Sequence, residues 1–107
     1  MKIAYAFRRA NLFPYVGDAW NLPGREVRAT WLRRVHDLGF DGIEIANNAV
    51  GGPSASAEQV RSLGKELADN GAPCVCVRGG GGLATPRTAA ANRARIEEAI
   101  RFASQIG

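Results

Sequence analysis

A short pattern that recurs along the chain constrains the fold most: a polar helix end, a glycine, and then an apolar run. It is clearest over Asp37–Ile45, written DLGFDGIEI, and returns over Asp69–Val77, written DNGAPCVCV. The glycines of the pattern, Gly39, Gly71 and Gly107, are 32 and 36 residues apart. A glycine at this place supplies the left-handed conformation that ends a helix. Since a strand with its crossover helix takes about 30 residues, the pattern predicts tandem βα units and a parallel sheet.

The predicted units form one α/β segment over residues 1–107, and no shift in composition marks a linker. Ser56 and Gln59 have the spacing of a capping box at one helix start. Thr85 and Pro86 suit the N-cap and the first residue of another helix. The expected strands are Lys2–Phe7, Gly42–Ala46 and Ala72–Val77, and the expected helices run over 25–38, over 57–70 and from 86 to the stop at 107.

Each expected helix carries an apolar stripe at helical spacing, which should face a common core. The stripes contain Val27, Trp31, Val35 and Leu38 in the first helix, Val60, Leu63 and Leu67 in the second, and Ile96, Ile100 and Ala103 in the third.

The composition is that of a globular chain, with 46% hydrophobic and 22% charged residues. The net charge of +4 comes from basic residues scattered along the helices, and no basic run is interleaved with aromatic residues. We therefore expect no nucleic-acid partner. The first residues offer neither a signal-peptide core nor a membrane span, so we expect a cytoplasmic protein without a membrane partner.

The only histidine and the two cysteines suggest no chemistry by themselves. His36 falls among the charged positions of its helix, where a catalytic or metal role is not expected. Cys74 and Cys76 lie two residues apart on one predicted strand, so their side chains point the same way, which is poor disulfide geometry. We expect small buried thiols.

Alternation along the strands predicts two different faces of the sheet. One face, suited to helices, carries the large branched residues Ile43, Ile45, Val75 and Val77. The other carries Glu44 and Arg78 among small residues, with Cys74 and Cys76 on the same side. A glutamate is costly on a face buried by helices, whereas the inner face of a closed barrel can hold polar groups near its mouth. Glu44 and Arg78 either balance each other's charge or line a pocket, and both can hold together.

Function in parallel sheets lies at the carboxyl ends of the strands, and this locates the candidate site. Amide and guanidinium groups there bind hydroxyls and anions. The long connection after the first strand carries three aromatic residues that either cover the sheet end or line a pocket. The candidate substrate-binding residues are Glu44, Asn47, Arg78, Phe13, Tyr15 and Trp20. No set of catalytic acid, catalytic base and metal ligands can be assembled.

The segment Leu38–Ile45, LGFDGIEI, together with the opening Met1-Lys2-Ile3 and the glycines after Arg78, resembles the amino-terminal part of the sugar phosphate isomerase/epimerase family, the xylose-isomerase-like barrels. The resemblance implies the first three units of a TIM-type (β/α)8 barrel that binds a divalent metal, manganese, magnesium or zinc. Enzymes of this family transfer a proton between carbons of a sugar or polyol-like substrate. Glu44 matches the family's second-strand glutamate. The family's metal ligands come from later strands and have no counterpart in this chain.

Two functions stay open. The chain is the amino-terminal part of a metal-dependent sugar (phosphate) isomerase or epimerase, or it is a non-catalytic binding or assembly module derived from half a barrel. The reading frame after codon 107 would separate them. In either case we expect the 107-residue chain to be inactive alone, and to self-associate or to need a missing carboxyl-terminal part, because three parallel strands leave exposed edges.

Overall fold

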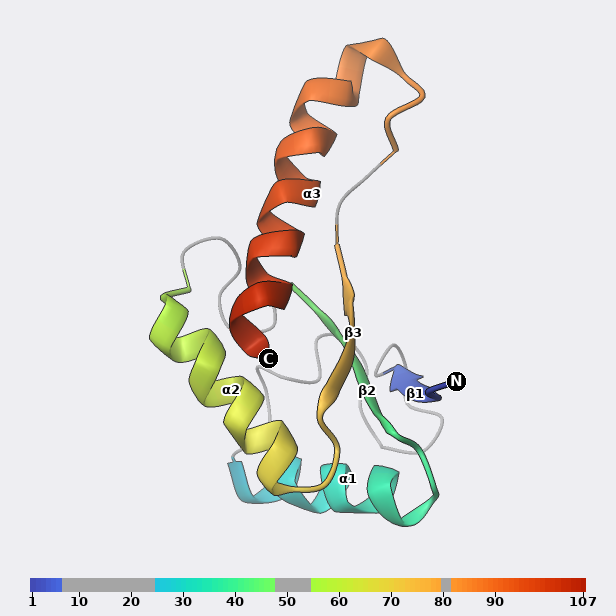
Figure 1. Cartoon of the computed structure of the whole chain (residues 1–107), viewed down its shortest axis with the longest axis vertical. Coiled ribbons are helices and arrows are strands. Elements are labelled where there is room, and N and C mark those ends of the chain that lie inside the picture. Colours follow the sequence, from blue (N-terminus) through green and yellow to red (C-terminus); the bar gives the residue numbers. More distant parts are fainter. Residues whose placement is uncertain (7–24, 48–54, 80–81) are drawn as a thin grey trace.

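The computed structural model describes residues 1–6, 25–47, 55–79 and 82–107. Strands and helices alternate along the chain, as the glycine pattern predicts (Figure 1). The three strands are parallel and lie in chain order, β1-β2-β3, which confirms an α/β arrangement. The elements are β1 (Ala4–Ala6), α1 (Arg25–Asp37), β2 (Gly42–Ala46), α2 (Ala57–Asp69), β3 (Cys74–Arg78) and α3 (Pro86–Ile106).

The three glycines of the repeated pattern have the left-handed conformation expected of them. Their φ angles are +85° at Gly39, +75° at Gly71 and +103° at Gly107. After Gly71 the helix-ending turn continues, because the amide of Ala72 donates to the carbonyl of Leu67 at 3.0 Å. This is why β3 begins at Cys74 rather than at the predicted Ala72.

The two predicted helix starts differ in how their N-caps are bonded. At α2 the capping box is complete: the Gln59 amide donates to the Ser56 hydroxyl at 3.1 Å, and the Ser56 amide donates to the Gln59 side chain at 2.8 Å. At α3 Pro86 takes the first turn as predicted, but the Thr85 side chain makes no capping bond. The Thr85 carbonyl instead accepts from the amide of Thr88.

One core joins the three helices to one face of the sheet. Ile43 and Ile45 of β2 supply its strand side, as the alternation predicts. Tyr5 of β1 packs against this core and meets Phe40 edge-on, with 5.4 Å between ring centroids. The helices contribute Leu32 and Val35 from α1, Val60, Leu63 and Leu67 from α2, and Phe102 and Ile106 from α3.

The predicted stripe is right for α2 but is rotated for the two other helices. Val27 and Leu38 of the α1 stripe are about half exposed, at 46% and 53%, while the unpredicted Leu32 is fully buried. In α3 the buried pair is Phe102 and Ile106, and Ile100 is 63% exposed. The first half of α3 extends beyond the sheet (Figure 1), and most of its residues are exposed.

Helices α2 and α3 approach each other closely at Gly64. A Cβ atom added at Gly64 would collide with the backbone carbonyl oxygen of Ile106. Gly64 is buried in the middle of α2, where glycine ordinarily weakens a helix. The close approach therefore explains its presence.

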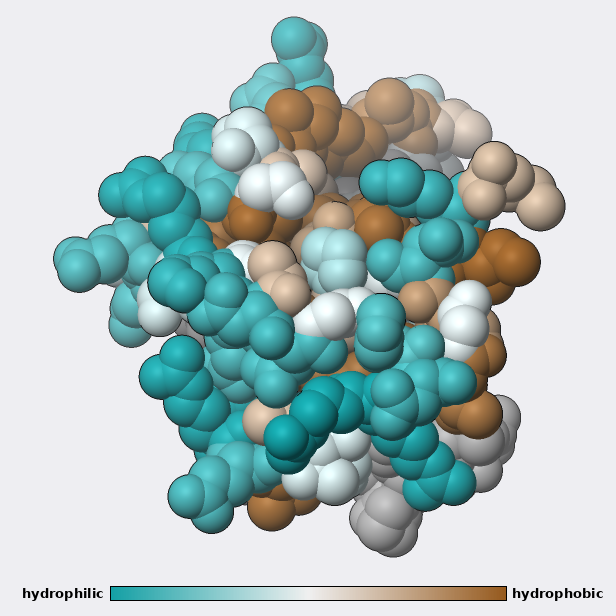
Figure 2. Space-filling model, turned by 60° about the horizontal axis from the view of Figure 1, so that its bottom comes forward, coloured by the Kyte–Doolittle hydropathy of each residue, from teal (hydrophilic) through white to brown (hydrophobic). Residues whose placement is uncertain are grey.

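The exteriors of the helices are hydrophilic. Figure 2 turns the α1 end of the molecule toward the viewer, and hydrophilic side chains cover most of the centre of this view. In α1, Arg33, Arg34 and Asp37 are exposed. In the described part of the chain, no helix combines the length and the apolar character that a membrane crossing would need.

Candidate functional site

Glu44 and Arg78 come together on the face of the sheet opposite the core. Glu44 lies in the middle of β2 between the buried Ile43 and Ile45, so alternation turns its side chain away from the helices. Arg78 is the last residue of the neighbouring strand β3. Its Nε atom lies 3.8 Å from Oε1 of Glu44, and the two side chains are 47% and 19% exposed. The expected pairing of these two charges is present.

Cys76 completes the group, which we call the Glu44 cluster: Glu44, Cys76 and Arg78. The register of the sheet places Cys76 directly beside Glu44. The Sγ atom of Cys76 lies 3.8 Å from Oε2 of Glu44, in a position to donate its proton to that oxygen. One carboxylate therefore has a thiol on one oxygen and a guanidinium near the other.

A register shift in the sheet separates the two cysteines. Ile43 pairs with Cys74 and the next residue, Glu44, pairs with Cys76, so Val75 is an extra residue in β3. Such a bulge breaks the simple alternation of faces. The prediction that Cys74 and Cys76 share a face is therefore wrong: Cys74 packs against the core and Cys76 is exposed. Both are free thiols, but the expectation of two buried thiols is wrong for Cys76, which is exposed, and Cys74 is only partly buried.

Burial of Cys74 has an electrostatic consequence. Desolvation chiefly, and the nearby Cys76 in addition, raise the pKa of the Cys74 thiol above its ordinary value, against a hydrogen bond to the Cys76 carbonyl that lowers it. A thiol with a raised pKa is a poor nucleophile at neutral pH. Cys74 is thus a packing residue, and Cys76 is the accessible thiol.

The floor around the Glu44 cluster consists of small residues. Ala6 of β1 pairs with Glu44 on one side, and Ala46 of β2 pairs with Arg78 on the other. Small residues on this face match the expectation from the sequence.

The chemistry that the cluster can perform is recognition of polar groups. A separation of 3.8 Å is an ion pair but too long for a hydrogen bond. The guanidinium of Arg78 therefore keeps donors for a hydroxyl or an anionic oxygen. Among the described residues, no three side chains of His, Cys, Asp and Glu are grouped so that they could hold a metal ion.

The other predicted site residues do not join this cluster in the part of the chain that the structure describes. The backbone amide of Asn47 donates to the carbonyl of Arg78 at 3.0 Å. The Asn47 side chain, however, lies beside Gly79 and Ala99, on the side of the sheet that the helices cover. Phe13, Tyr15 and Trp20 lie outside the described residues.

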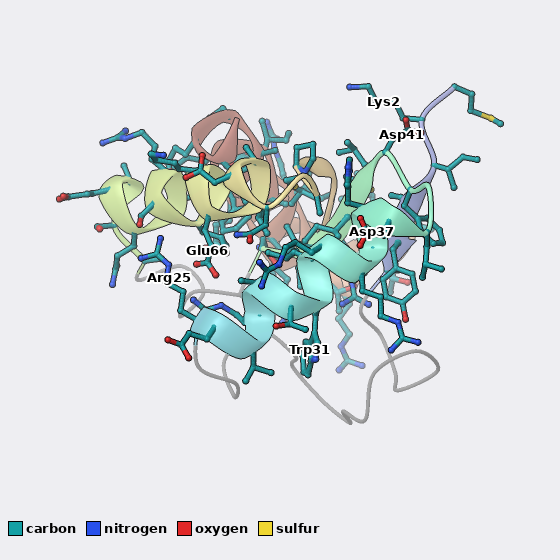
Figure 3. All side chains as sticks on the ribbon, turned by 90° about the horizontal axis from the view of Figure 1, so that it is seen from below. Lys2, Arg25, Trp31, Asp37, Asp41 and Glu66 are labelled. Atoms are coloured by element: carbon teal, nitrogen blue, oxygen red, sulfur yellow. The ribbon has the colours of Figure 1, made fainter. Side chains whose placement is uncertain are left out.

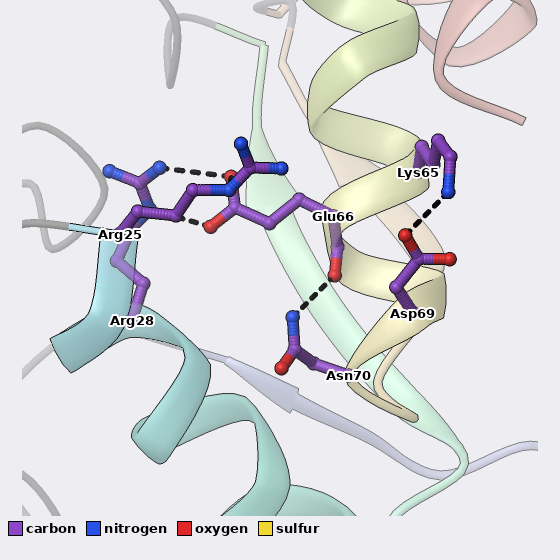
Figure 4. Close-up of polar contacts among 6 residues, drawn as sticks. All are labelled: Arg25, Arg28, Lys65, Glu66, Asp69 and Asn70. Atoms are coloured by element: carbon purple, nitrogen blue, oxygen red, sulfur yellow. Dashed lines mark hydrogen bonds and ion pairs between the residues drawn. The ribbon is translucent and has the colours of Figure 1, made fainter.

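A second charged group, which the sequence analysis did not predict, joins α1 to α2. Glu66 is only 6% exposed, and its carboxylate accepts two bonds from Arg28, both 2.9 Å (Figure 4). Arg25 approaches the same carboxylate at 3.9 Å, and Figure 3 shows Glu66 pointing from α2 toward the start of α1. The signal in the sequence is that Glu66 lies between the apolar positions Leu63 and Leu67, which face the core. This group is a clamp between helices, since its donors and acceptors satisfy one another.

His36 is engaged in a structural contact. Its Nδ1 atom lies 3.0 Å from the carbonyl oxygen of Gly71, so Nδ1 carries the proton and donates it to that oxygen. The contact ties the last turn of α1 to the turn after α2.

Comparison with protein-family models, curated proteins and solved structures finds no significant match to this chain.

Proposed function

We propose that the chain provides the first three βα units of a TIM-type barrel of the xylose-isomerase-like family, and that the whole barrel is a cytoplasmic sugar phosphate isomerase or epimerase. The observation that carries the proposal is the position of Glu44. It projects from the middle of β2 on the face opposite the core, and the adjacent strand supplies Arg78. In a closed barrel that face is the interior.

The proposed substrate is a sugar or polyol, with a phosphate as an additional group. Arg78 presents planar donors that suit a phosphate or vicinal hydroxyls. Glu44 is the hydrogen-bond acceptor for a hydroxyl. In this proposal both residues bind and orient the substrate, and neither is a catalytic residue.

A divalent metal belongs to the proposal through the family resemblance alone. The described residues do not fit it: near Glu44 the only other metal-binding group is the Cys76 thiol, and the Arg78 cation lies 3.8 Å from the carboxylate. A neighbouring cation opposes metal binding. We therefore assign the Glu44 cluster to the substrate, and no step of the reaction to a metal held by these residues.

The proposal is tested by titrating the 107-residue chain with a ketose phosphate, fructose 6-phosphate, and following binding by calorimetry. Arg78→Ala should weaken binding about tenfold or more, while its free energy of unfolding falls by about 1 kcal/mol at most, because the Arg78 side chain is half exposed and its ion pair is long, at 3.8 Å. Arg93→Ala removes an exposed pair with Glu97 on α3 and is the matched control, expected to bind as the unchanged chain does.

Separate titrations with fructose and with inorganic phosphate measure how much of the binding affinity comes from the sugar and how much from the phosphate. Binding of phosphate alone as tight as that of the sugar phosphate would contradict the sugar part of the proposal. Equal losses of binding and stability in Arg78→Ala would favour a purely structural ion pair, as would an absence of binding. Binding without turnover is expected of the isolated chain.

A further inference from the structure

A pocket of about 100 Å³ lies between α2, α3 and the end of β2. Two core residues, Val60 and Phe102, form part of its wall, so it lies on the helix-covered side of the sheet. The Glu44 cluster is on the opposite face and shares no residue with it. The polar residues of the wall are Asn47, Glu98, Arg101 and Gln105.

The polar residues converge on the pocket because of their spacing. In α3, Arg101 and Gln105 follow Glu98 by three and by seven residues, so the three side chains lie along one face of that helix. Phe102 lies within the same stripe and reaches the core. Asn47 immediately follows β2 and reaches the pocket from the carboxyl end of the sheet.

None of these four side chains has a hydrogen bond or an ion pair with another described residue. One turn earlier in α3, Arg93 and Glu97 do form an exposed ion pair at 3.3 Å. Asn47, Glu98 and Gln105 are also half-buried. Polar groups partly removed from water ordinarily have partners, whereas these three, together with the exposed Arg101, line one small pocket.

The mixture of charges selects the kind of ligand. A lone anion would suit Arg101 but not the carboxylate of Glu98 beside it, and a lone cation would have the opposite difficulty. A dipolar ligand satisfies both, with its carboxylate on Arg101 and its ammonium group on Glu98. The carboxamides of Asn47 and Gln105 can then bond the remaining donors and acceptors.

The size of the pocket limits the ligand further. A volume of about 100 Å³ compares with roughly 30 Å³ for a water molecule in the liquid, so a ligand of a few heavy atoms fits. The apolar part of the wall, Ala55, Val60 and Phe102, suits a hydrogen or a methyl group. We propose that this pocket binds a small zwitterionic α-amino acid, glycine or alanine.

The proposal is tested by NMR titration of the ¹⁵N-labelled chain with alanine and with glycine. We expect saturable shifts of the amides that line the pocket, with a dissociation constant of about 10 mM or lower. Acetate and ethylamine, which carry one charge each, should bind about tenfold more weakly or worse. The amide signals of the Glu44 cluster should not shift in this titration. If alanine does not bind, the proposed sugar site is unaffected, and if the sugar phosphate does not bind at the Glu44 cluster, the proposed amino-acid pocket is unaffected.

Glu98→Gln and Arg101→Gln should each weaken alanine binding about tenfold or more. Their matched controls are Glu97→Gln and Arg93→Gln on the same helix, which should leave it unchanged. The dispersion of the amide shifts checks that each variant folds. Gln105→Leu is a third variant of the pocket wall, and it changes no charge. Shifts that never saturate would mean a solvent-filled groove, and acetate binding as tightly as alanine would mean a simple anion site. Either result, or unaltered binding in Glu98→Gln, would overturn the proposal.

Discussion

At the scale of single residues, stability depends strongly on the partners of Glu66. Its side chain is 7% exposed and its carboxylate is bonded twice by Arg28. Arg28→Met would leave a buried charge with only the distant Arg25, and we expect a loss of about 3 kcal/mol in the free energy of unfolding. Urea denaturation measures it. Lys65→Met breaks the exposed pair with Asp69 and should cost less than about 0.5 kcal/mol.

Replacing both members of this clamp is the sharper experiment. If the loss in Arg28→Met comes from an unpaired buried carboxylate, the double variant Arg28→Met, Glu66→Met should recover most of it, since apolar groups of similar volume tolerate burial. A double variant no more stable than Arg28→Met would show that the lost packing of Arg28 dominates instead.

The two cysteines should behave differently toward pH and toward reagents. The folded state holds Cys74 protonated beyond its ordinary pKa of 9.0, mainly through burial. The contribution of the protonated Cys74 thiol to the free energy of unfolding is complete below that pKa. It is lost as the pH rises, because this thiol ionises at a lower pH in the unfolded chain than in the folded one. The fall in urea midpoint between pH 7 and pH 10 should therefore be smaller in Cys74→Ala than in the unchanged chain.

The same difference appears in thiol labelling. Cys76 is exposed and Cys74 is only partly accessible, so iodoacetamide at pH 8 should alkylate Cys76 first, as peptide mass spectrometry would show. Equal rates at the two thiols would contradict the bulge that separates their faces.

At the scale of elements, the two helix starts give a matched pair of substitutions. Ser56→Ala removes the hydroxyl that accepts from the Gln59 amide, one of the two bonds of the α2 capping box, and should cost about 1 kcal/mol. Thr85→Ala removes a side chain that makes no capping bond and should cost only a few tenths of a kcal/mol. Thermal denaturation of both variants measures this, and equal costs would be inconsistent with the different caps.

The order and the ends of the elements were predictable because their signals are local. Gly39, Gly71 and the Ser56–Gln59 spacing act within a few residues, and the structure confirms each. The side-chain face of Cys74, before the bulge in β3, was not predictable from alternation. The extra residue Val75 depends on the register against β2, and register is a property of two strands.

The face of each helix that is buried was predicted for α2 alone. The apolar residues of α2 are few and form a single stripe, whereas α1 and α3 carry more apolar residues than one face holds. The choice of Leu32 over Val27, and of Phe102 over Ile100, depends on where the sheet and the other helices lie. This is tertiary information that the periodicity of one helix lacks.

At the scale of the whole molecule, the candidate site was predictable in part. Glu44 and Arg78 were expected on one face because strand parity is reliable next to strongly apolar residues such as Ile43 and Ile45. Asn47 was expected beside them but lies on the other side of the sheet, where it lines the α2–α3 pocket. Nothing local in the sequence reveals that pocket, because it combines residues 47, 55 and 60 with residues between 98 and 105.

The edges of the sheet lead to a prediction about association. Within the described residues β1 and β3 each pair on one side only, so both outer edges present unpaired backbone groups. Such edges attract further strands. We expect the chain to be larger than a monomer at about 100 μM in reducing buffer, a concentration in the micromolar range where exposed strand edges associate. Light scattering coupled to gel filtration measures the mass.

Cys76→Lys tests whether β3 is the edge that associates. Cys76 is exposed, and a lysine on an edge strand discourages pairing through its charge and its hydration. We expect this variant to shift toward the monomer mass. Ser104→Lys adds the same charge at an exposed position of α3, away from the edge, and should associate as the unchanged chain does. A monomeric unchanged chain, or equal masses for the two lysine variants, would mean that the outer edge of β3 is already protected.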